Sequence, residues 1–428
     1  MARFVIEGGR KLKGVVWPIG NKNAVLKMIP ASILTAEPVT LTNVPAISDV
    51  KIMLKIMESI GTVINYDEPA GILTLHTPKI KNTVIDPVSA KKIRASNMFL
   101  GPLLARAGTV TSVPPGGDKI GPREMNAHFD GFDRLGASLK RNQDDSFTLK
   151  GDLRGQEIFL YEPSVTATEN IILAAVLAKG NTVIINAASE PHVQELCKLL
   201  ALMGADIKGI GTNRLNIAGV AALRGVHYKI PPDYIYVGTM IVLAAITGGG
   251  LTIKNVIHED LRSILYFFEK LGVKTIRRGD DLFIPENQKM KVRDEMWARS
   301  KGVYCQPWPC FPTDMMSLAI ILGTQVEGSI LFFEKMYSGR MFFADYLNGM
   351  RANIIIADPH RVVVNGKTKL KGRTLQAPDL RAGMAYVAAG LCAEGVTVVE
   401  NIEHIERGYP HMEAVLKKLG ARVRRVED

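Results

Sequence analysis

Charged residues occupy four short segments rich in glycine or proline, and turns of this kind often carry the side chains that bind substrates. The first segment places Lys22 and Asn23 just after Gly20 and before a long apolar run. An ammonium group beside the free N–H groups of a helix N-terminus suits a phosphate or a carboxylate. A lone lysine in a turn is also a common structural feature, so Lys22 by itself leaves both interpretations open.

The second segment, residues 114–123, is a dense run of glycine and proline between two regular elements, which is typical of a long and specifically shaped loop. It carries the carboxylate of Asp118 together with the cations Lys119 and Arg123, and Arg94 precedes the apolar run before it. Such loops commonly serve as lids over a substrate. A solvated turn with a local ion pair is the alternative that the loop alone leaves open.

The other two segments supply a carboxylate and several arginines. Asp314 precedes an apolar helix, where it could cap the helix or act as a general base. Arg340, Arg381 and Arg407 lie in loops or at strand ends. Asp379 comes two residues before Arg381. Guanidinium groups bind carboxylate and phosphate through two parallel hydrogen bonds, so these arginines are candidates for an anion site or for surface ion pairs.

The overall composition is that of a globular protein with an anionic partner. The 428 residues include 53 Lys and Arg against 42 Asp and Glu, a formal net charge of +11. No polybasic tail or aromatic-basic pattern accompanies this excess, which argues against nucleic acid as the partner. The four cysteines lack metal-ligand spacing, which predicts free thiols and no metal site. With no signal peptide and no apolar run of membrane length, we expect a cytoplasmic protein without a membrane partner.

A repeated pattern runs along the chain. Six times, an almost wholly apolar stretch is followed by glycine or Glu-Gly and then by a β-branched run. The apolar half has no polar face, which predicts a helix buried on all sides, and the β-branched half predicts a strand. The six segments span residues 29–44, 97–113, 170–186, 240–256, 318–333 and 385–402.

An amphipathic helix and a further strand accompany most of these segments. Gly61, Gly204, Gly272 and Gly420 stand where such helices should end, because glycine adopts the left-handed conformation at no steric cost. Each repeat therefore combines a buried helix, a surface helix and several strands, and the six repeats divide into three plus three. These features predict an α/β fold and say nothing about chemistry.

Chain length and repeats together predict two domains. The turn at residues 230–233 is the best linker candidate. We expect residues 21–231 to form the first domain, which carries the glycine-rich loop, and residues 1–20 and 232–428 to form the second. The strand at residues 4–6 should pair within the second domain, since a terminal strand left alone would be an unprotected edge.

Six short motifs in this order resemble those of the enolpyruvyl transferase family, in particular its UDP-N-acetylglucosamine 1-carboxyvinyltransferases (MurA). The resemblance covers almost the whole chain. It implies a two-domain inside-out α/β barrel, with three repeats around buried helices in each domain and the active site in the cleft between them. The motifs are Lys22-Asn23-Ala24, Arg94-Ala95-Ser96, Pro115-Gly116-Gly117 with Ile120-Gly121, Phe311-Pro312-Thr313-Asp314-Met315, Asp379-Leu380-Arg381-Ala382, and His404-Ile405 with Arg407-Gly408-Tyr409.

The resemblance also implies a reaction. The enolpyruvyl group of phosphoenolpyruvate would pass to the 3-hydroxyl of UDP-N-acetylglucosamine with release of phosphate, the first committed step of peptidoglycan synthesis. Lys22, Arg123 and Arg407 would neutralise the donor, Asn23 would position the substrates, and Asp314 would be the base at the hydroxyl. Such chemistry needs no metal or other cofactor.

Further roles follow from the same resemblance. Asp118 would be the acid that protonates the donor, and Arg340, Asp379 and Arg381 would support loop closure and a second anion site. The implied contacts to the UDP-sugar are Arg94, Arg123, Glu124, Met125, Asn126, Ala127, Glu162, Pro163, Ser164, Val165 and Met336.

Asp118 stands where most members of the family have cysteine. A carboxylic acid can also deliver a proton when it is buried or lies beside another anion. It cannot form the thioether through which fosfomycin inactivates the cysteine enzymes, because that adduct needs a thiolate. The sequence therefore predicts catalysis together with fosfomycin resistance.

Other departures keep alternatives open. Tyr236 replaces a usual Glu, Glu162 replaces a common Lys, and Ser338 and Gly339 replace a usual Glu-Asn pair. These changes leave a non-catalytic or divergent UDP-sugar-binding paralogue as one alternative. A shikimate-3-phosphate enolpyruvyl transferase is the other, although the Ser-Lys-Ser-x-Ser-Asn-Arg motif typical of that enzyme is absent.

Overall fold

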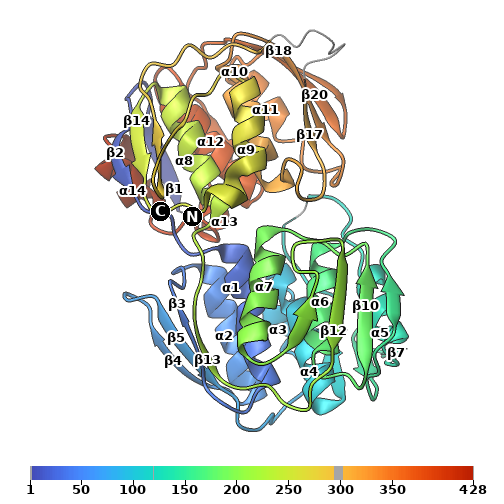
Figure 1. The fold of residues 1–428 in the computed structure, drawn as a ribbon. Helices are drawn as coiled ribbons and strands as arrows, with labels where there is room; N and C mark the ends of the chain where they lie inside the picture. Colours follow the sequence, from blue (N-terminus) through green and yellow to red (C-terminus); the bar gives the residue numbers. More distant parts are fainter. Residues whose placement is uncertain (1, 119, 294–301, 428) are drawn as a thin grey trace. The chain divides into compact units, whose positions relative to one another are not determined.

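The computed structural model describes residues 2–118, 120–293 and 302–427, which form a mixed α/β fold (Figure 1). Within these residues the strands form six small sheets. The chain folds into two compact units, and each unit contains three of the sheets. Unit 1 comprises Met1–Ile19, Lys119–Pro122 and Pro232–Asp428, and unit 2 comprises Gly20–Asp118 and Arg123–Pro231.

Unit 2 has its own apolar core, into which the helices α1, α4 and α6 are packed. Its sheets have the strand orders β13-β3-β5-β4, β6-β8-β7 and β11-β12-β10-β9. The helices are α1 (Lys22–Ala31), η1 (Ser32–Leu34), α2 (Ser48–Ile60), α3 (Pro87–Ala90), η2 (Arg94–Phe99), α4 (Leu100–Ala107), α5 (Asn126–Arg134), α6 (Val165–Ala175) and α7 (Pro191–Leu202). The strands are β3 (Val39–Thr42), β4 (Val63–Asp67), β5 (Ile72–His76), β6 (Thr109–Ser112), β7 (Ser138–Arg141), β8 (Phe147–Lys150), β9 (Glu157–Phe159), β10 (Asn181–Ile185), β11 (Asp206–Lys208), β12 (Arg214–Ala218) and β13 (Val226–Lys229).

Unit 1 has a second, separate apolar core around α8, α10 and α12, which pack against one another. Its sheets have the orders β21-β22-β1-β23, β15-β16-β14-β2 and β17-β18-β20-β19. The helices are α8 (Tyr234–Thr247), α9 (His258–Lys270), η3 (Thr313–Met315), α10 (Met316–Thr324), α11 (Ala344–Gly349), α12 (Leu380–Cys392), α13 (Glu403–Glu406) and α14 (Met412–Lys418). The strands are β1 (Arg3–Glu7), β2 (Lys13–Val16), β14 (Gly250–Ile253), β15 (Ile276–Arg278), β16 (Asp281–Ile284), β17 (Gly302–Cys305), β18 (Gly328–Glu334), β19 (Ile354–Asp358), β20 (Arg361–Gly366), β21 (Thr374–Gln376), β22 (Val396–Glu400) and β23 (Arg422–Val426).

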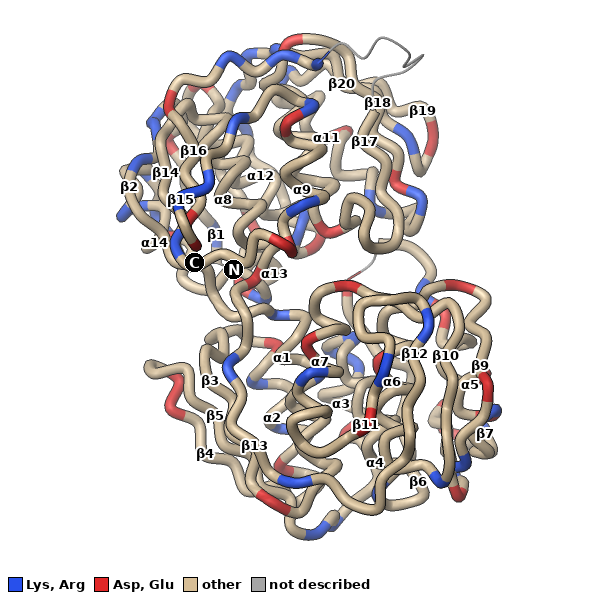
Figure 2. Tube along the Cα trace, viewed as in Figure 1, with Lys and Arg blue, Asp and Glu red and all other residues tan. Residues whose placement is uncertain are grey.

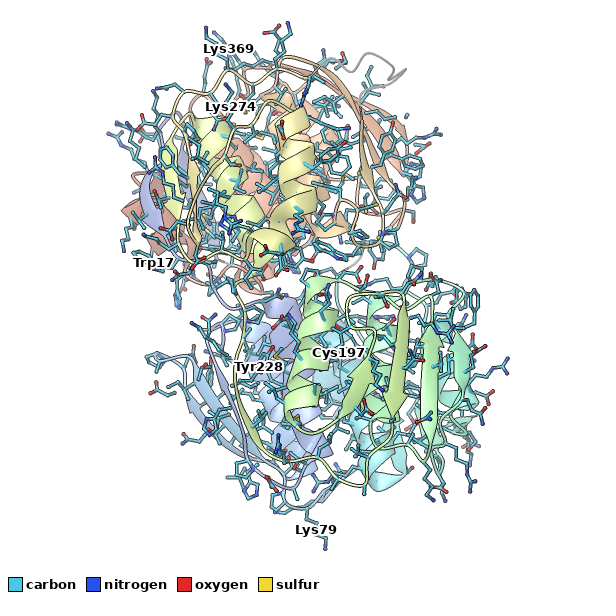
Figure 3. All side chains as sticks on the ribbon, in the orientation of Figure 1. Trp17, Lys79, Cys197, Tyr228, Lys274 and Lys369 are labelled. Carbon is cyan, nitrogen blue, oxygen red and sulfur yellow. The ribbon has the colours of Figure 1, made fainter. Side chains whose placement is uncertain are left out.

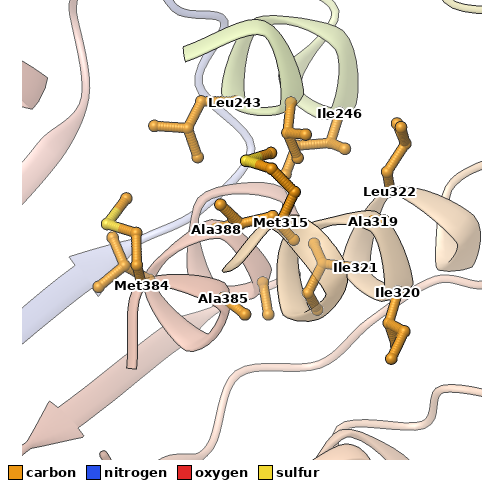
Figure 4. Close-up of a cluster of buried hydrophobic side chains, with 14 of the residues drawn as sticks. Leu243, Ile246, Met315, Ala319, Ile320, Ile321, Leu322, Met384, Ala385 and Ala388 are labelled. Carbon is orange, nitrogen blue, oxygen red and sulfur yellow. The ribbon is translucent and has the colours of Figure 1, made fainter. Parts of the chain in front are cut away.

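Two of the predicted buried helices, α8 and α10, are apolar and buried along almost their whole length. All residues of α10 are buried, and α8 is buried from Tyr234 to Ile246. Figure 4 shows Leu243 of α8, Ile321 of α10 and Ala385 of α12 in one cluster of apolar side chains. A helix without a polar face has no side that could remain in water, so it must lie inside the unit.

The glycines predicted at helix ends have left-handed backbones. Gly61 directly follows α2 with φ of 102°, and Gly204 and Gly420 follow α7 and α14 with φ of 107° and 96°. A side chain would be strained in this conformation, whereas glycine is not. These residues end the amphipathic helices and let the following strand begin.

The N-terminal strand lies inside a sheet, as predicted. β1 pairs antiparallel with β22 on one side and with β23 on the other, with Arg3 opposite Glu400 and Val426. The first strand of the chain therefore completes a sheet of unit 1 whose other strands come last.

Charged residues and cysteines are spread over both units. Figure 2 shows Lys and Arg interspersed with Asp and Glu along both units. The four cysteines are free thiols, and Cys197, labelled in Figure 3, is buried on α7. In the ranges that the structure describes, no helix is both long and apolar enough to cross a lipid bilayer.

Candidate active site

Lys22 is the first residue of α1 and is buried. The Asn21 side chain caps the helix by accepting a hydrogen bond from Ala24 N (3.1 Å). Lys22 Nζ lies 2.9 Å from Asp49 Oδ2, and both side chains are less than one-tenth exposed. The sequence predicts Lys22 as a site residue but not its partner Asp49. The half-buried Asn23 follows in the first turn of the helix.

The glycine-rich loop brings two of the predicted arginines together. Arg123 Nη2 donates a hydrogen bond to the carbonyl oxygen of Asp118 (2.7 Å), and Arg94 Nη2 donates to the carbonyl oxygen of Glu124 (3.2 Å). Gly117 lies between them with φ of 110°, and a Cβ there would be 2.9 Å from Arg123 Nη2 and 3.0 Å from Arg94 Cβ. The loop therefore requires glycine at this position for the two cations to sit side by side.

A buried imidazole links this region to α6. Asn170 Nδ2 lies 3.0 Å from His128 Nδ1 and donates to the carbonyl oxygen of Asn97 (3.0 Å). Because the amide is the donor, His128 Nδ1 is the acceptor, and its Nε2 carries the proton toward Thr166 Oγ1 (3.0 Å). Burial, with the cation Arg94 acting in the same direction, lowers the pKa of His128 to about 3, so the imidazole is neutral.

The predicted sugar-binding stretch at residues 123–127 is held by side-chain contacts. Asn126 Nδ2 donates to Glu124 Oε2 (2.7 Å), and Asn97 Nδ2 lies 3.6 Å from Met125 Sδ. Ala127 is buried in the first turn of α5. These contacts join the stretch to η2, the element that begins with Arg94.

The other predicted stretch, residues 162–165, leads into α6. Glu162 is exposed, Pro163 is half-buried, and the carbonyl oxygen of Glu162 accepts from Ser164 N (2.7 Å). Ser164 is the N-cap residue, and the helix begins at Val165. Because the next residue, Thr166, bonds the imidazole described above, the structure places this stretch beside residues 123–127 within unit 2.

In unit 1, Asp314 is held by two arginines. Its Oδ1 accepts from Arg340 Nη2 (3.2 Å), and its Oδ2 accepts from Arg381 Nη2 (2.8 Å). The arginine side chains are 4% and 6% exposed, whereas that of Asp314 is 25% exposed. The carboxylate is thus fixed in orientation by two buried cations while part of it stays accessible.

The two guanidinium groups are firmly charged. Burial is the largest single influence and works against the charge of each, but Asp314 and the other neighbouring groups together outweigh it, so the pKa values of both Arg340 and Arg381 are raised. An arginine with no neutral form accessible is a permanent source of positive charge for an anionic ligand or a developing oxyanion.

The buried hydroxyl groups of Tyr409 and Thr239 extend the hydrogen bonds of Arg381. Arg381 Nη1 donates to Tyr409 Oη (3.1 Å), which lies 2.8 Å from Thr239 Oγ1. Thr239 gives its own proton to the carbonyl oxygen of Ile235 (2.8 Å), so Tyr409 is the donor to Thr239. Tyr236, where the resemblance leads one to expect Glu, packs against Tyr409 with ring centroids 6.1 Å apart.

The remaining predicted residues of unit 1 are Asp379, Arg407 and Met336, and each lies in a different structural element or turn. Asp379 caps α12, where its Oδ1 accepts from the backbone N atoms of Arg381 (2.8 Å) and Ala382 (3.0 Å). Arg407 is the half-buried C-cap residue of α13. The backbone N of Met336 donates to Glu334 Oε1 (2.8 Å). Asp379 therefore acts on the group through the helix that carries Arg381.

Several residues in these contacts carry no motif that would reveal them from sequence. Asp49, His128 and Asn170 contact residues 27 or more positions away, and the Glu334 carboxylate accepts from Thr313, 21 positions away. Tyr409 lies inside a motif but was not predicted as a site residue. Lys119 lies outside the described residues. Among the residues that are described, no group of three or more His, Cys, Asp or Glu is placed to hold a metal ion.

Comparison with known sequences supplies close relatives. The family model described as EPSP synthase (3-phosphoshikimate 1-carboxyvinyltransferase) matches residues 6–416. A UDP-N-acetylglucosamine 1-carboxyvinyltransferase of Bradyrhizobium diazoefficiens is 45% identical over 426 residues, which cover 100% of this chain and 98% of the relative. The protein of the same name from Treponema denticola is 46% identical over 424 residues, 99% of each chain.

Solved structures share the fold. The enolpyruvyl transferase NikO from Streptomyces tendae superposes with a TM-score of 0.89 at 22% identity and covers 99% of both chains. An EPSP synthase from Acinetobacter baumannii gives a TM-score of 0.76 at 19% identity over 100% of both chains. At these identities the likeness concerns the fold alone.

Proposed function

Because the chain belongs to the EPSP synthase family of enolpyruvyl transferases, we propose that it transfers the enolpyruvyl group of phosphoenolpyruvate to the 3-hydroxyl of UDP-N-acetylglucosamine and releases phosphate. The observation that carries this choice of acceptor is the identity of 45–46%, over essentially the whole chain, to relatives named for that reaction. The cation-rich groups in both units fit a donor that carries a phosphate and a carboxylate.

The proposal assigns one domain to residues 21–231 and a second to residues 1–20 and 232–428, both inside-out barrels. Residues of both would act on the same substrates in the cytoplasm. Separate apolar cores in the two units support two domains. The groups around Lys22 and Asp314 are separate, which supports different roles. Lys22 would bind the donor, and Asp314 would act on the acceptor hydroxyl.

The chemistry follows in two steps. Asp314 takes the proton of the sugar's 3-hydroxyl while the hydroxyl oxygen forms a bond to C2 of phosphoenolpyruvate. In the same step Asp118 gives a proton to C3. The bond between C2 and the phosphate oxygen then breaks and phosphate leaves with the bonding electrons, while the new methyl group returns one proton to Asp118 and the double bond is restored. Lys22, Arg123 and Arg407 offset the negative charge of the donor and of the leaving phosphate, an effect for which one donor group is worth about 10²–10³ in rate.

Phosphate release tests the proposal directly. The purified chain is incubated with phosphoenolpyruvate and either UDP-N-acetylglucosamine or shikimate 3-phosphate. We expect release that depends on the UDP-sugar. Release that depends on shikimate 3-phosphate would assign the other acceptor. Tight binding of the UDP-sugar without release would assign a non-catalytic binding protein.

The loop carboxylate gives a second prediction. With aspartate at position 118 the loop offers no thiol for alkylation, so we expect fosfomycin to leave activity unchanged. The substitution Asp118→Cys should make the enzyme sensitive, with progressive loss of activity during preincubation. Wild type, which keeps the carboxyl group and has no thiol at this position, is preincubated in parallel as the control and should stay insensitive. An active Asp118→Cys enzyme that the drug does not inactivate would contradict the assignment of Asp118 to the reacting loop.

A further inference from the structure

Glu334, the last residue of β18, is a buried carboxylate that the proposed reaction does not use. The residue is 0% exposed. A carboxylate that is removed from water is unfavourable unless hydrogen-bond donors replace the water. The donors that surround Glu334 therefore show what the residue holds in place.

Two different chain segments donate to this one carboxylate. Thr313 Oγ1 donates to Oε2 (2.7 Å). The backbone N atoms of Met336 and Tyr337 donate to Oε1 (2.8 and 3.2 Å). Thr313 directly precedes Asp314, and Met336 and Tyr337 begin the turn that leads to Arg340. Glu334 thus ties the segment of the proposed base to the segment of one of the arginines that hold it.

The backbone of Glu334 is itself anchored. Its N donates to the carbonyl oxygen of His360 (2.8 Å), and His360 Nδ1 lies 2.7 Å from the Glu334 carbonyl oxygen. The charge of Glu334 also reaches its surroundings, because it adds to the effect of Asp314 in raising the pKa of Arg340. Burial, followed by the same carboxylate, raises the pKa of the neighbouring Cys305 thiol. The anchored strand end therefore presents the Glu334 carboxylate to both segments.

We propose that Glu334 is a positioning residue of the transfer reaction, which sets the orientation of the Asp314 carboxylate by holding η3 and the turn before Arg340 at a fixed separation. This inference rests on the proposed function. Without the Thr313 bond, η3 can shift relative to the turn, and the 3.2 Å contact between Arg340 Nη2 and Asp314 Oδ1 is lost. Met336, a predicted contact of the UDP-sugar, is held by the same carboxylate, so acceptor binding and base orientation share one support.

Thr313→Val tests the link with little change of shape, since it replaces only the hydroxyl. Because the lost bond holds the segment that carries Asp314, we expect kcat to fall about tenfold, which corresponds to about 1.4 kcal/mol in the activation free energy. The KM values for both substrates should stay within about twofold of wild type. Thr313→Ser, which keeps the hydroxyl, should restore kcat. Ser329→Ala is the control, because Ser329 is exposed on the same strand and, within the described residues, its hydroxyl donates only to Asn365 Oδ1 (2.6 Å).

Glu334→Gln removes the charge and keeps the shape and one acceptor oxygen, and it should lower kcat in the same way. Crystal structures of Thr313→Val and Glu334→Gln supply a readout that does not need activity. We expect the separation of Asp314 Oδ1 and Arg340 Nη2 to exceed hydrogen-bond distance. Wild-type kcat in Thr313→Val, or a reduced kcat with this pair intact, would overturn the inference. If wild type itself lacked UDP-sugar-dependent phosphate release, the proposed function would fail, and the crystal structures would still decide whether Glu334 orients Asp314.

Discussion

Each unit buries a group of charged side chains, and the two groups are satisfied very differently. In unit 1 the two oxygens of Asp314 accept from buried arginines at 2.8 and 3.2 Å. In unit 2, Lys27 Nζ lies 3.6 Å from Glu169 Oε2, and His192 Nε2 lies 3.9 Å from Glu169 Oε1. Neither oxygen of Glu169 accepts a hydrogen bond from the part of the chain that the structure describes.

The difference shows that hydrogen-bond donors, rather than burial alone, decide whether a buried group keeps its charge. Burial raises the pKa of Glu169 to about 8, although Lys27 acts against it. The arginines of unit 1 are buried too, yet their pKa values rise because the bonded carboxylate of Asp314 and further neighbouring groups together outweigh the loss of water. Unit 1 therefore holds a permanent charge arrangement, and unit 2 holds a carboxyl group that takes up a proton near neutral pH.

Removal of the central carboxylate of unit 1 should have the largest effect. Asp314→Leu leaves Arg340 and Arg381 buried without their shared anion, which we expect to lower the free energy of unfolding by about 3 kcal/mol. The loss of the base should lower kcat by about 10²–10⁴. Urea unfolding and phosphate release measure the two effects. Asp345→Ala, at an exposed position of the same unit, should change neither. A stable, active Asp314→Leu enzyme would show that the Asp314 group of unit 1 does not depend on its carboxylate, which would contradict the contrast with the Glu169 group of unit 2.

Titration of Glu169 should have an intermediate effect. Its pKa is raised on folding from 4.5 to about 8, so the folded state binds the proton more tightly. The resulting stability is fully present below pH 4.5 and is lost as the pH rises toward about 8. Glu169→Gln has no such proton to lose. We expect wild type to lose on the order of 3 kcal/mol more than this variant between pH 5 and 8, measured by urea unfolding. Parallel pH profiles would mean that Glu169 is charged in the folded chain.

The smallest effect should come from the hydroxyl behind Arg381. Tyr409→Phe removes the acceptor of the Arg381 bond and the donor to Thr239, which we expect to lower kcat about tenfold and stability by about 1–1.5 kcal/mol. Tyr66→Phe is the matched control in unit 2, because the Tyr66 hydroxyl is buried and unbonded within the described residues. Equal losses in both variants would show that the hydroxyl matters only for packing.

The sequence predicts the helices and strands well because their signals are local. Wholly apolar runs predict α8 and α10, and Gly61 predicts the end of α2, because burial and left-handed backbone depend on nearby residues. The site is predicted only in part. Asp314, Arg340 and Arg381 are recognisable one by one, but the bonds between them join positions 26 and 67 residues apart.

Residues whose important partners are distant in the sequence escape sequence reasoning altogether. Glu334 stands at the end of a β-branched and aromatic run and resembles an ordinary strand terminus. Asp49 has the same appearance as any acidic residue in the first turn of a helix, a position that the helix dipole favours anyway. Only the fold shows that Asp49 meets Lys22 and that Glu334 meets Thr313. The domain bounds and the roles of the site residues stay predictions.

The place of β1 between β22 and β23 has a consequence for biosynthesis. Arg3 must wait for Glu400 and Val426 to be translated before its strand has neighbours on either side. At about 5–20 residues per second this interval is roughly 20–80 s. All of unit 2 has been translated once Pro231 is added, because the segment Lys119–Pro122 between its two parts belongs to unit 1. Unit 2 can therefore fold on the ribosome during this time. β1 is thus among the last strands to be paired, and nascent chains must keep it from pairing elsewhere until β22 and β23 emerge.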